Sequence, residues 1–326
     1  MQKRPGLLLV NLGSPRSPSK EDVRVYLKEF LNDPYVIDLP APFRWLLVDG
    51  LILNTRPQKS ADAYQKIWMK EGSPLLYHTR LLAEKTGRKL PYPVEFGMRY
   101  GEPNIETAVK NLIHRGVNHI LMIPLYPQYS FAASETALVE FERALKNYEG
   151  RISYSVVEDF FDHPGFIESF AATIRPSLER VQPDLLMLSY HGIPQKHLKK
   201  TRNRKNYRDD CLKTSDLLAD ALSLPKEKIR TTFQSRLGPT EWIRPFTDHV
   251  LKELPAQGIK RIVVASPSFT ADCLETLEEI DIRYRELFLK SGGEAFEYAP
   301  CPNSSDRFVD TVVKIATTSR SENPSD

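Results

Sequence analysis

The sequence predicts an α/β protein made of two similar domains, each with a parallel sheet flanked by helices. Short apolar segments alternate with longer segments of helical periodicity, a pattern typical of βαβ units. Several of the apolar segments are hydrophobic almost throughout, as strands of a parallel sheet covered on both faces are. The expected strands lie at residues 7–12, 94–98, 120–124, 153–157, 185–189, 230–233 and 261–265.

The two halves of the chain also resemble each other weakly. Gly116 and Gly258 each stand shortly before an expected strand. Upstream of each glycine lies another strand, followed by an arginine and a glycine turn, at residues 96–103 and 233–239. This repetition favours a duplicated Rossmann-like domain.

The duplication suggests where the domains begin and end. We expect an N-terminal α/β domain at residues 1–150 and a C-terminal one at residues 151–316. The polar residues 317–326 are predicted to be a disordered tail. Because domain interfaces are common places for ligand sites, we expect the active-site cleft between the two domains.

Composition narrows the class of protein. The 326 residues are 41% hydrophobic and 27% charged, and the net charge of +3 is too small to indicate a nucleic-acid partner. The three cysteines include no CxxC pair, so neither a disulfide framework nor a structural zinc site is predicted. With no uninterrupted apolar run of about 18 residues, we expect no membrane span. The odd number of cysteines fits a reducing compartment best, so we expect a cytoplasmic location.

Two segments break the regular pattern. Residues 34–57 are rich in apolar side chains and punctuated by charges. They form either an amphipathic helix that closes over the core or an apolar lip that grips a flat substrate or touches a membrane. The basic run at residues 196–208 is either a solvated loop or a patch attracted to an anionic lipid or substrate.

A single histidine follows the expected strand at residues 185–189. His191 stands just before Gly192 and Pro194, at the point where the strand gives way to a turn. Ligands of open α/β sheets bind outside the carboxyl ends of the strands. His191 is therefore either a structural histidine or a group that accepts a proton or holds a metal ion.

An acidic helix follows the expected strand at residues 261–265. Asp272, Glu275 and Glu279 are spaced i, i+3 and i+7, which places them along one face of an α-helix. Like charges this close repel each other unless they face water or a cation. The alternatives are an exposed acidic face or, with His191, a site for Fe²⁺, Mn²⁺ or Zn²⁺.

Aromatic residues stand just past several expected strand ends. Tyr126, Trp242 and Phe269 are either core residues or the wall of a site for a flat apolar ligand. The chain has no Gly-x-Gly-x-x-Gly after its first strand, no Walker-type loop and no Gly-x-Ser-x-Gly elbow. Dinucleotide enzymes, P-loop NTPases and α/β-hydrolases are therefore disfavoured.

At these residues the chain closely resembles the ferrochelatases, enzymes that insert Fe²⁺ into a porphyrin to make haem. The resemblance covers nearly the whole chain. The motifs that carry it lie at residues 11–15, 25–33, 72–75, 125–130, 189–194, 233–238 and 272–279.

The resemblance implies a chelatase-type fold, a lyase activity and a set of site residues. The catalytic positions of the family fall on His191 and Glu275, which would also meet the metal ion. Asp272 and Glu279 fall where the family carries further acids that lead to the metal. The porphyrin-contacting positions of the family are matched by Leu12, Arg99, Tyr100, Tyr126, Ser130, Trp242 and Phe269.

The resemblance also bears on cofactors, and here the chain departs from some relatives. Some ferrochelatases hold an iron–sulfur cluster through four cysteines, often in a C-terminal extension. This chain has three cysteines, and Cys301 is the last, so we expect no cluster and no permanently bound cofactor, with Fe²⁺ as a substrate. Many relatives carry histidine where this chain has Cys273, so no role of a second histidine is carried over.

The function implied is the terminal step of haem biosynthesis. We expect Fe²⁺ to enter protoporphyrin IX, giving protohaem and two protons, because the apolar lip suits a substrate with two vinyl groups and two propionates. Alternatives are coproporphyrin III as substrate, a related chelatase for Co²⁺ or Ni²⁺, or a non-catalytic haem or porphyrin carrier. The lip and the basic run favour peripheral contact with the inner face of an anionic membrane, and no nucleic-acid partner is expected.

Overall fold

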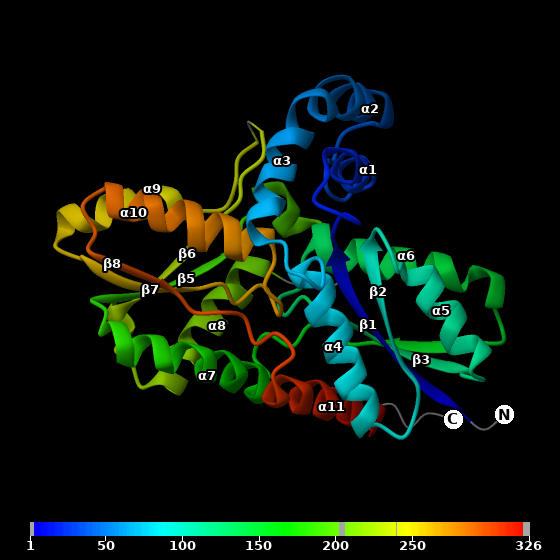
Figure 1. Ribbon diagram of the computed structural model, residues 1–326. Helices are drawn as coiled ribbons and strands as arrows, with labels where there is room; N and C mark the ends of the chain where they lie inside the picture. The colour runs from blue at the N-terminus through cyan, green and yellow to red at the C-terminus, as the bar shows by residue number, and fades with distance from the viewer. Residues whose placement is uncertain (1–2, 202–205, 239, 322–326) are drawn as a thin grey trace. The chain divides into compact units, whose positions relative to one another are not determined.

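The computed structural model describes residues 3–201, 206–238 and 240–321, with side chains up to residue 318. The chain forms two compact units. Unit 1 comprises the described residues of Met1–Leu125, Phe131–Glu158 and Val312–Asp326, and unit 2 those of Tyr126–Ser130 and Asp159–Thr311. Figure 1 shows the elements of each unit along the colour ramp.

Unit 1 is built on a parallel sheet with the strand order β2-β1-β3-β4. Its strands are β1 (Pro5–Gly13), β2 (Val94–Tyr100), β3 (His119–Pro124) and β4 (Ser153–Val156). β1 ends at a residue that must be glycine. Gly13 has φ +112°, and a Cβ there would lie 1.8 Å from the carbonyl oxygen of Tyr100 on the neighbouring strand.

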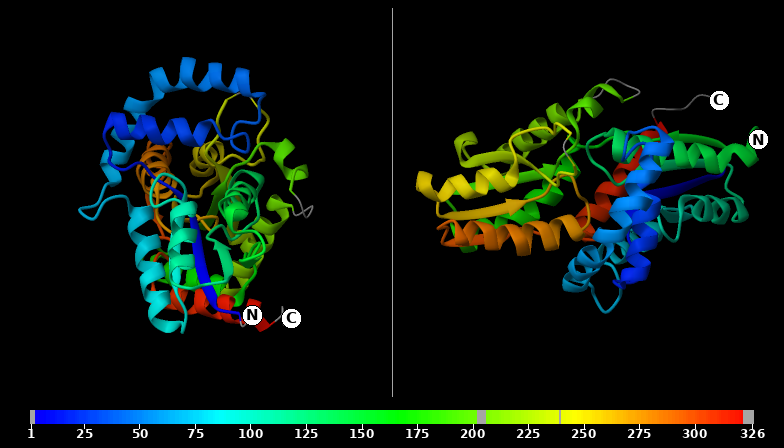
Figure 2. Two further views of the ribbon diagram at one scale, coloured as in Figure 1. Left: turned by 90° about the vertical axis from the view of Figure 1, so that its right-hand side faces the viewer. Right: turned by 90° about the horizontal axis from the view of Figure 1, so that it is seen from above.

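Helices cover this sheet and extend beyond its edge. α4 packs against β1 and β2, while α5 packs against β2 and beside α6. In Figures 1 and 2 the blue helices α1, α2 and α3 stand beyond the carboxyl end of β1. The helices are α1 (Lys20–Leu31), α2 (Ala41–Leu47), α3 (Leu53–Ile67), α4 (Pro74–Lys89), α5 (Ile105–His114) and α6 (Thr136–Leu145), with short turns η1 (Val48–Ile52), η2 (Phe131–Glu135) and η3 (Lys146–Tyr148).

Unit 2 repeats the same design. Its parallel sheet has the order β6-β5-β7-β8. In each unit, the strand that comes first in the sequence therefore lies between the second and the third strands of that unit. The strands are β5 (Leu185–His191), β6 (Ile229–Gln234), β7 (Arg261–Ala265) and β8 (Ala295–Tyr298). The duplicated α/β architecture predicted from the sequence is confirmed.

Helices cover both faces of the second sheet. Figure 1 shows α7 and α8 on one face and α9 and α10 on the other. Their bounds are α7 (Pro164–Val181), α8 (Tyr207–Leu222), α9 (Thr247–Glu253), α10 (Arg285–Lys290) and α11 (Asp306–Ser321), with shorter helical segments η4 (Gln195–Lys199), η5 (Lys226–Lys228), η6 (Leu254–Gln257) and η7 (Leu274–Tyr284). Apolar side chains of β5, β7 and β8 form the core with residues of α9, η7 and α10.

The structure corrects three details of the sequence analysis. β8 was not expected, because its four residues alternate between buried and half-buried and give no continuous apolar run. β4 pairs with β3, so the boundary expected after residue 150 falls inside unit 1. α11 continues to Ser321, so residues 317–321 of the expected disordered tail are helical, and the rest of that tail lies outside the described residues.

Candidate active site

β5 brings His191 to the edge of the second sheet. Its residues from Leu185 to Tyr190 are buried, and His191 at its carboxyl end is half-buried. β5 pairs in parallel with β6 on one side and β7 on the other, so His191 lies at an inner position of the sheet. This is the edge at which open α/β sheets bind their ligands.

Hydrogen bonds hold the backbone and the ring of His191. Its backbone N donates to the hydroxyl of Ser268 over 2.9 Å, and the Tyr207 hydroxyl donates to its carbonyl oxygen over 2.8 Å. Nδ1 lies 2.7 Å from the carbonyl oxygen of Gly192. Because a carbonyl oxygen only accepts, Nδ1 carries the proton in the neutral ring. The lone pair of the ring is then on Nε2, which has no hydrogen-bond partner within the described part of the chain.

Gly192 allows the chain to turn directly after His191. Its backbone N donates to the carbonyl oxygen of Gln234 over 2.7 Å. A Cβ at position 192 would lie 2.6 Å from that same oxygen, which is closer than Cβ atoms come. Trp242, half-buried and predicted to contact the substrate, forms an isolated bridge with Pro194 on this turn.

The acidic segment is a π-helix and not the α-helix that the sequence analysis assumed. η7 spans Leu274–Tyr284, with Glu275 half-buried in its first turn. The i→i+5 bonds of a π-helix widen each turn, so the i, i+3, i+7 argument for one face does not apply. Segments of this kind are frequent at functional sites.

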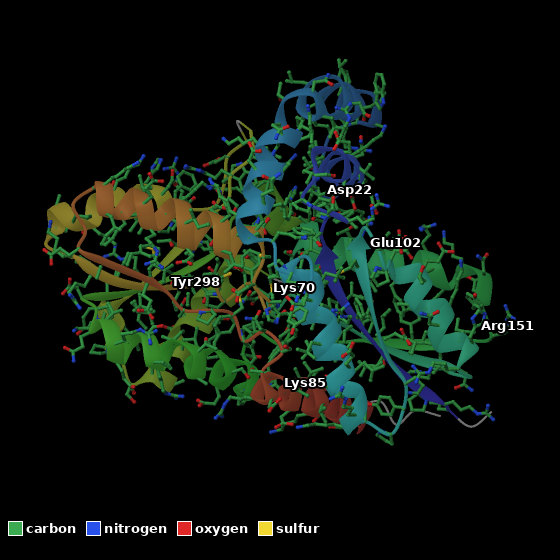
Figure 3. All side chains as sticks on the ribbon, viewed as in Figure 1. Asp22, Lys70, Lys85, Glu102, Arg151 and Tyr298 are labelled. Atoms are coloured by element: carbon green, nitrogen blue, oxygen red, sulfur yellow. The ribbon has the colours of Figure 1, made fainter. Side chains whose placement is uncertain are left out.

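Asp272 lies just before η7 and is surrounded by donors. Its Oδ1 accepts hydrogen bonds from the Tyr298 hydroxyl at 2.6 Å and from the backbone N of Cys301 at 3.2 Å. Its Oδ2 accepts a bond from Asn303 Nδ2 at 2.7 Å. Figure 3 labels Tyr298, the last residue of β8. The carboxylate is buried and held by protein groups on both oxygens.

Glu279 is held in the same way one turn further along η7. Its Oε1 accepts hydrogen bonds from the backbone N of Ser235 at 3.1 Å and from the Tyr284 hydroxyl at 2.8 Å. The Ser235 hydroxyl donates to Oε2, and a guanidinium nitrogen of Arg283 lies 3.8 Å from the same oxygen. Burial, together with the charge of Glu279, raises the pKa of Tyr284.

The four predicted metal-contacting residues are therefore not gathered into one coordination set. Among the residues that the structure describes, no group of three or more His, Cys, Asp or Glu side chains is placed to hold a metal ion. Asp272 and Glu279 direct their oxygens at protein donors. His191 and Glu275 remain as the candidates. Nε2 of His191 has no hydrogen-bond partner among the described residues, and the Glu275 carboxylate lies beside the buried Cys273 thiol.

Arg99 and Tyr100 belong to a buried network in unit 1. The guanidinium of Arg99 pairs with Asp33 and donates to the Thr136 hydroxyl at 2.8 Å. The Tyr100 hydroxyl donates to Asp33 over 2.8 Å, and Tyr100 has no exposed surface. Burial and the charge of Asp33 raise the pKa of Tyr100. Asp33 is thus a shared anchor of two predicted substrate residues, one that sequence reasoning did not single out.

The other predicted substrate positions lie at strand ends. Leu12 is half-buried near the end of β1, and Phe269 is half-buried in the turn after β7. The Phe269 and His191 rings approach edge to face with centroids 6.0 Å apart. Tyr126 and Ser130 are buried in the segment that follows β3 and belongs to unit 2.

The three cysteines are all buried and in no disulfide. Burial, followed by the nearby charge of Glu275, raises the pKa of the Cys273 thiol. Burial, followed by the charge of Asp272, does the same for Cys301. Whether the protein carries an iron–sulfur cluster stays a prediction from the sequence.

The segment at residues 34–57 exposes apolar side chains. α2 has no buried residue, whereas Val48, Leu53 and Pro57 further along are buried. The segment is thus exposed at α2 and packed on the core further along. Phe43, Trp45 and Leu46 of α2 and Leu51 of η1 are each about 60% exposed or more. We call these four residues the apolar lip. In the basic run, residues 202–205 lie outside the described part of the chain.

Comparison with known proteins shows which family the chain belongs to. The family model described as ferrochelatase matches residues 4–320. The chain belongs to the ferrochelatase family. The ferrochelatase of Vibrio cholerae is 43% identical over 317 residues, covering 96% of this chain and 97% of its own. That of Yersinia pestis is 43% identical over 311 residues, covering 95% and 96%. The predicted enzyme class, a porphyrin metal chelatase, is confirmed.

Solved structures agree with the fold. SirB from Bacillus subtilis with Fe³⁺ superposes with a TM-score of 0.62 at 13% identity, covering 98% of both chains. A sirohydrochlorin chelatase SirB from Bacillus subtilis subspecies spizizenii, in complex with cobalt, gives a TM-score of 0.59 at 14% identity, with 98% and 97% covered. At this identity the likeness concerns the fold alone, and it supports the chelatase-type architecture expected from the sequence.

Proposed function

We propose that this ferrochelatase-family protein inserts Fe²⁺ into protoporphyrin IX, and that His191 and Glu275 carry the reaction. The observation behind the residue assignment is the state of the His191 ring. Its Nδ1 proton is engaged by Gly192, and Nε2 is left with a lone pair at the carboxyl end of β5. Glu275 stands in the first turn of η7, the segment that follows the adjacent strand β7.

The chemistry requires two acceptors for protons. Fe²⁺ replaces two pyrrole N–H protons, so the products are the metalloporphyrin and two protons. Nε2 of a neutral histidine accepts a proton near neutral pH, or first holds the ion. A carboxylate such as Glu275 suits Fe²⁺ and also takes a proton. In our proposal His191 takes one pyrrole proton. Glu275 takes the other, or it meets the incoming ion and solvent takes the other proton.

Asp272 and Glu279 contribute in this proposal through position. Each carboxylate is buried and accepts bonds from residues distant in sequence, Asn303 for Asp272 and Ser235 for Glu279. These bonds support a role in fixing the two ends of the turn that carries Glu275. Direct contact of either acid with iron or protons in transit stays a prediction from the family resemblance.

The experiment that tests the proposal is anaerobic metallation followed by absorbance. Fe²⁺ is mixed with protoporphyrin IX or with coproporphyrin III, and the wild type is compared with His191→Ala and Glu275→Gln. Removing a general base costs about 10²- to 10⁴-fold, so we expect at least a 100-fold loss in each variant. His114→Ala, at an exposed histidine ending α5, is the matched control and should keep the wild-type rate.

Each outcome of this experiment has a definite meaning. Near-full metallation by both His191→Ala and Glu275→Gln contradicts the residue assignment. Faster metallation of coproporphyrin III contradicts the choice of protoporphyrin IX. Tight porphyrin binding without metallation by the wild type would indicate a carrier, and preference for Co²⁺ or Ni²⁺ a chelatase for another metal.

We also propose that the apolar lip makes peripheral contact with an anionic membrane. Within the described residues no helix has the length and hydropathy of a membrane span. Phe43 and Trp45 lie on α2 beside Arg44, which is a combination typical of interfacial segments. The protein should float with anionic vesicles and remain in the dense fraction with neutral ones.

Variants distinguish membrane contact through the apolar lip from non-specific hydrophobic adsorption to the vesicles. Phe43→Ser combined with Trp45→Ser should remove flotation, whereas Leu289→Ser, at an equally apolar exposed site on α10, should not. Flotation that survives the double change would contradict a contact made by the lip.

A further inference from the structure

The side-chain amide and the backbone carbonyl of Gln234 connect the strand of His191 with the turn of Glu275. It is the last residue of β6 and is 1% exposed. Its Oε1 accepts a hydrogen bond from the Ser189 hydroxyl at 2.8 Å, and its Nε2 donates to the carbonyl oxygen of Glu275 at 2.9 Å. Its own carbonyl oxygen accepts the bond from Gly192 N at 2.7 Å.

The sheet register places these bonds around the candidate catalytic pair. His191 and Gln234 are direct partners in the β5–β6 ladder. The backbone of Gln234 thereby holds the residue after His191, and its side chain holds the backbone of Glu275. The buried amide of Gln234 therefore ties the backbone of Glu275 to the strand that carries His191.

The orientation of this amide is fixed by its surroundings. The Ser189 hydroxyl is fully buried and lies 2.8 Å from the Thr247 hydroxyl, which in turn donates to Thr232 at 2.9 Å. If the amide were flipped, Oε1 would face the carbonyl oxygen of Glu275, and two acceptors would oppose each other. Only the observed orientation lets the amide accept from the Ser189 hydroxyl and donate to the carbonyl oxygen of Glu275.

The remaining anchors of η7 do not depend on this amide. Asp272 before the helix is held by Asn303 and Tyr298, and Glu279 within it is held by Ser235 and Tyr284. Loss of the Gln234 side chain therefore leaves η7 attached at two other points. In the first turn, the Thr276 hydroxyl accepts a bond from the backbone N of Cys273 at 2.9 Å and donates to Asp272 Oδ1 at 3.2 Å. What the Gln234 amide adds is the bond to the backbone of Glu275 itself.

We propose that Gln234 is a positioning residue for metal insertion, holding the first turn of η7 so that Glu275 and His191 act on the same porphyrin. This inference rests on the proposed roles of His191 and Glu275. The Gln234 side chain is engaged by Ser189 and Glu275, and it acts through the residues it holds.

The first test is Gln234→Leu, which puts an apolar side chain of similar size in place of the amide and removes both of its hydrogen bonds. Small displacements of catalytic groups cost up to about 100-fold, so we expect kcat for Fe²⁺ insertion to fall about 10- to 100-fold. The Kd for protoporphyrin IX, measured by fluorescence quenching, should change less than about twofold, since no substrate contact is removed. Ser189→Ala breaks one end of the amide link and should give a smaller loss.

The second test is Gln234→Glu, which replaces the amide with a carboxyl group that donates a hydrogen bond only when it is protonated. The ionised carboxyl cannot donate to the carbonyl oxygen of Glu275, but the protonated one can. Burial favours the protonated form. The ratio of kcat for this variant to that of the wild type should therefore rise as pH falls, while the ratio for Gln234→Leu stays flat. A role in stability alone would leave both ratios flat.

The outcomes distinguish this inference from the function on which it rests. Ser169→Ala is the control, since its buried hydroxyl bonds Gly165 and Thr311 and touches none of these groups. If His191→Ala is inactive while Gln234→Leu keeps kcat within twofold, the positioning role is wrong and the site assignment stands. If His191→Ala stays active, the site assignment itself fails. Should Gln234→Leu not fold, a flat ratio for Gln234→Glu overturns the inference.

Discussion

At the scale of single residues, the chemistry of His191 is decided by its neighbour in the chain. The carbonyl oxygen of Gly192 accepts from Nδ1, and so Nε2 is the nitrogen that can take a proton. Gly192 can adopt this arrangement because it has no Cβ to meet the carbonyl oxygen of Gln234. The same residue thus selects the tautomer and permits the turn.

The cost of a side chain at this turn can be measured. Gly192→Ala places a methyl group 2.6 Å from the Gln234 carbonyl oxygen, so the backbone must shift. Overpacking of this kind costs about 1–3 kcal/mol of unfolding free energy, and metallation should fall with it. Urea unfolding measures the first effect. Gly87→Ala in α4, where the nearest atom is 3.6 Å away, should be neutral or stabilising, and equal losses in the two variants would contradict the argument.

A second residue-scale prediction concerns the buried thiol of Cys211. Burial raises its pKa, so the folded chain keeps this proton at a pH where the unfolded chain releases it. Stability therefore falls as pH rises above the ordinary thiol pKa of about 8.5, by at most about 1.4 kcal/mol per pH unit. Cys211→Ala should show a shallower decline between about pH 8.5 and 10 in urea unfolding. Parallel declines in the two proteins would refute this.

At the scale of elements, hydrogen bonds from other parts of the chain stabilise the geometry of η7. A π-helix of eleven residues is unusual, because such helices mostly occur as single turns. Bonds from Ser235, just after β6, and from Tyr284 at the end of η7 converge on Glu279. Bonds from the loop after β8 hold Asp272. Asp272 and Glu279 are thus part of what holds this helix in place, whereas the Glu275 carboxylate lies beside the Cys273 thiol.

Removing one bond to Glu279 tests that view. Tyr284→Phe takes away a hydroxyl that donates to a buried carboxylate, and such bonds to charged groups contribute about 1.5–3 kcal/mol. Tyr154→Phe is the matched control, because its hydroxyl also donates to a glutamate, Glu142, but at an exposed site. We expect a change below about 0.5 kcal/mol there. Similar losses of unfolding free energy for both would argue against anchoring by Glu279.

At the scale of the whole molecule, the two duplicated units are not two continuous halves of the chain. The two sheets share one strand order, yet unit 1 takes residues from three separate stretches of the chain. β4 completes the first sheet, although it follows residue 150, where the domain boundary was expected. The segment Tyr126–Ser130 belongs to unit 2 while both of its flanks belong to unit 1.

This arrangement predicts how fragments behave. A fragment of residues 1–150 lacks β4 and leaves the edge of β3 unpaired, whereas a fragment of residues 1–158 keeps the four-stranded sheet. We expect the longer fragment to resist limited proteolysis better and to give a more cooperative urea transition. Equal behaviour of the two would show that β4 is dispensable to the unit.

Much of the fold was predictable from consecutive residues. Apolar runs predicted the strands, and their alternation with helical segments predicted parallel sheets, because side-chain periodicity is a local property of the sequence. His191 was identifiable because a buried strand leads directly to it. The ferrochelatase motifs, being stretches of adjacent residues, were readable in the same way and named the family correctly.

Only the tertiary structure decided what the acidic residues do. Asp272 bonds Asn303, about thirty residues away in the sequence. Glu279 bonds Ser235, and the backbone of Glu275 bonds Gln234, each across more than forty residues. Whether a carboxylate faces a donor or a substrate depends on which distant groups folding brings beside it, and no local pattern records that. The sequence by itself determined the α/β class, the family and the strand-end histidine. The π-helix and the buried partners of its acids came from packing, because hydrogen bonds between distant residues form only once the chain has folded.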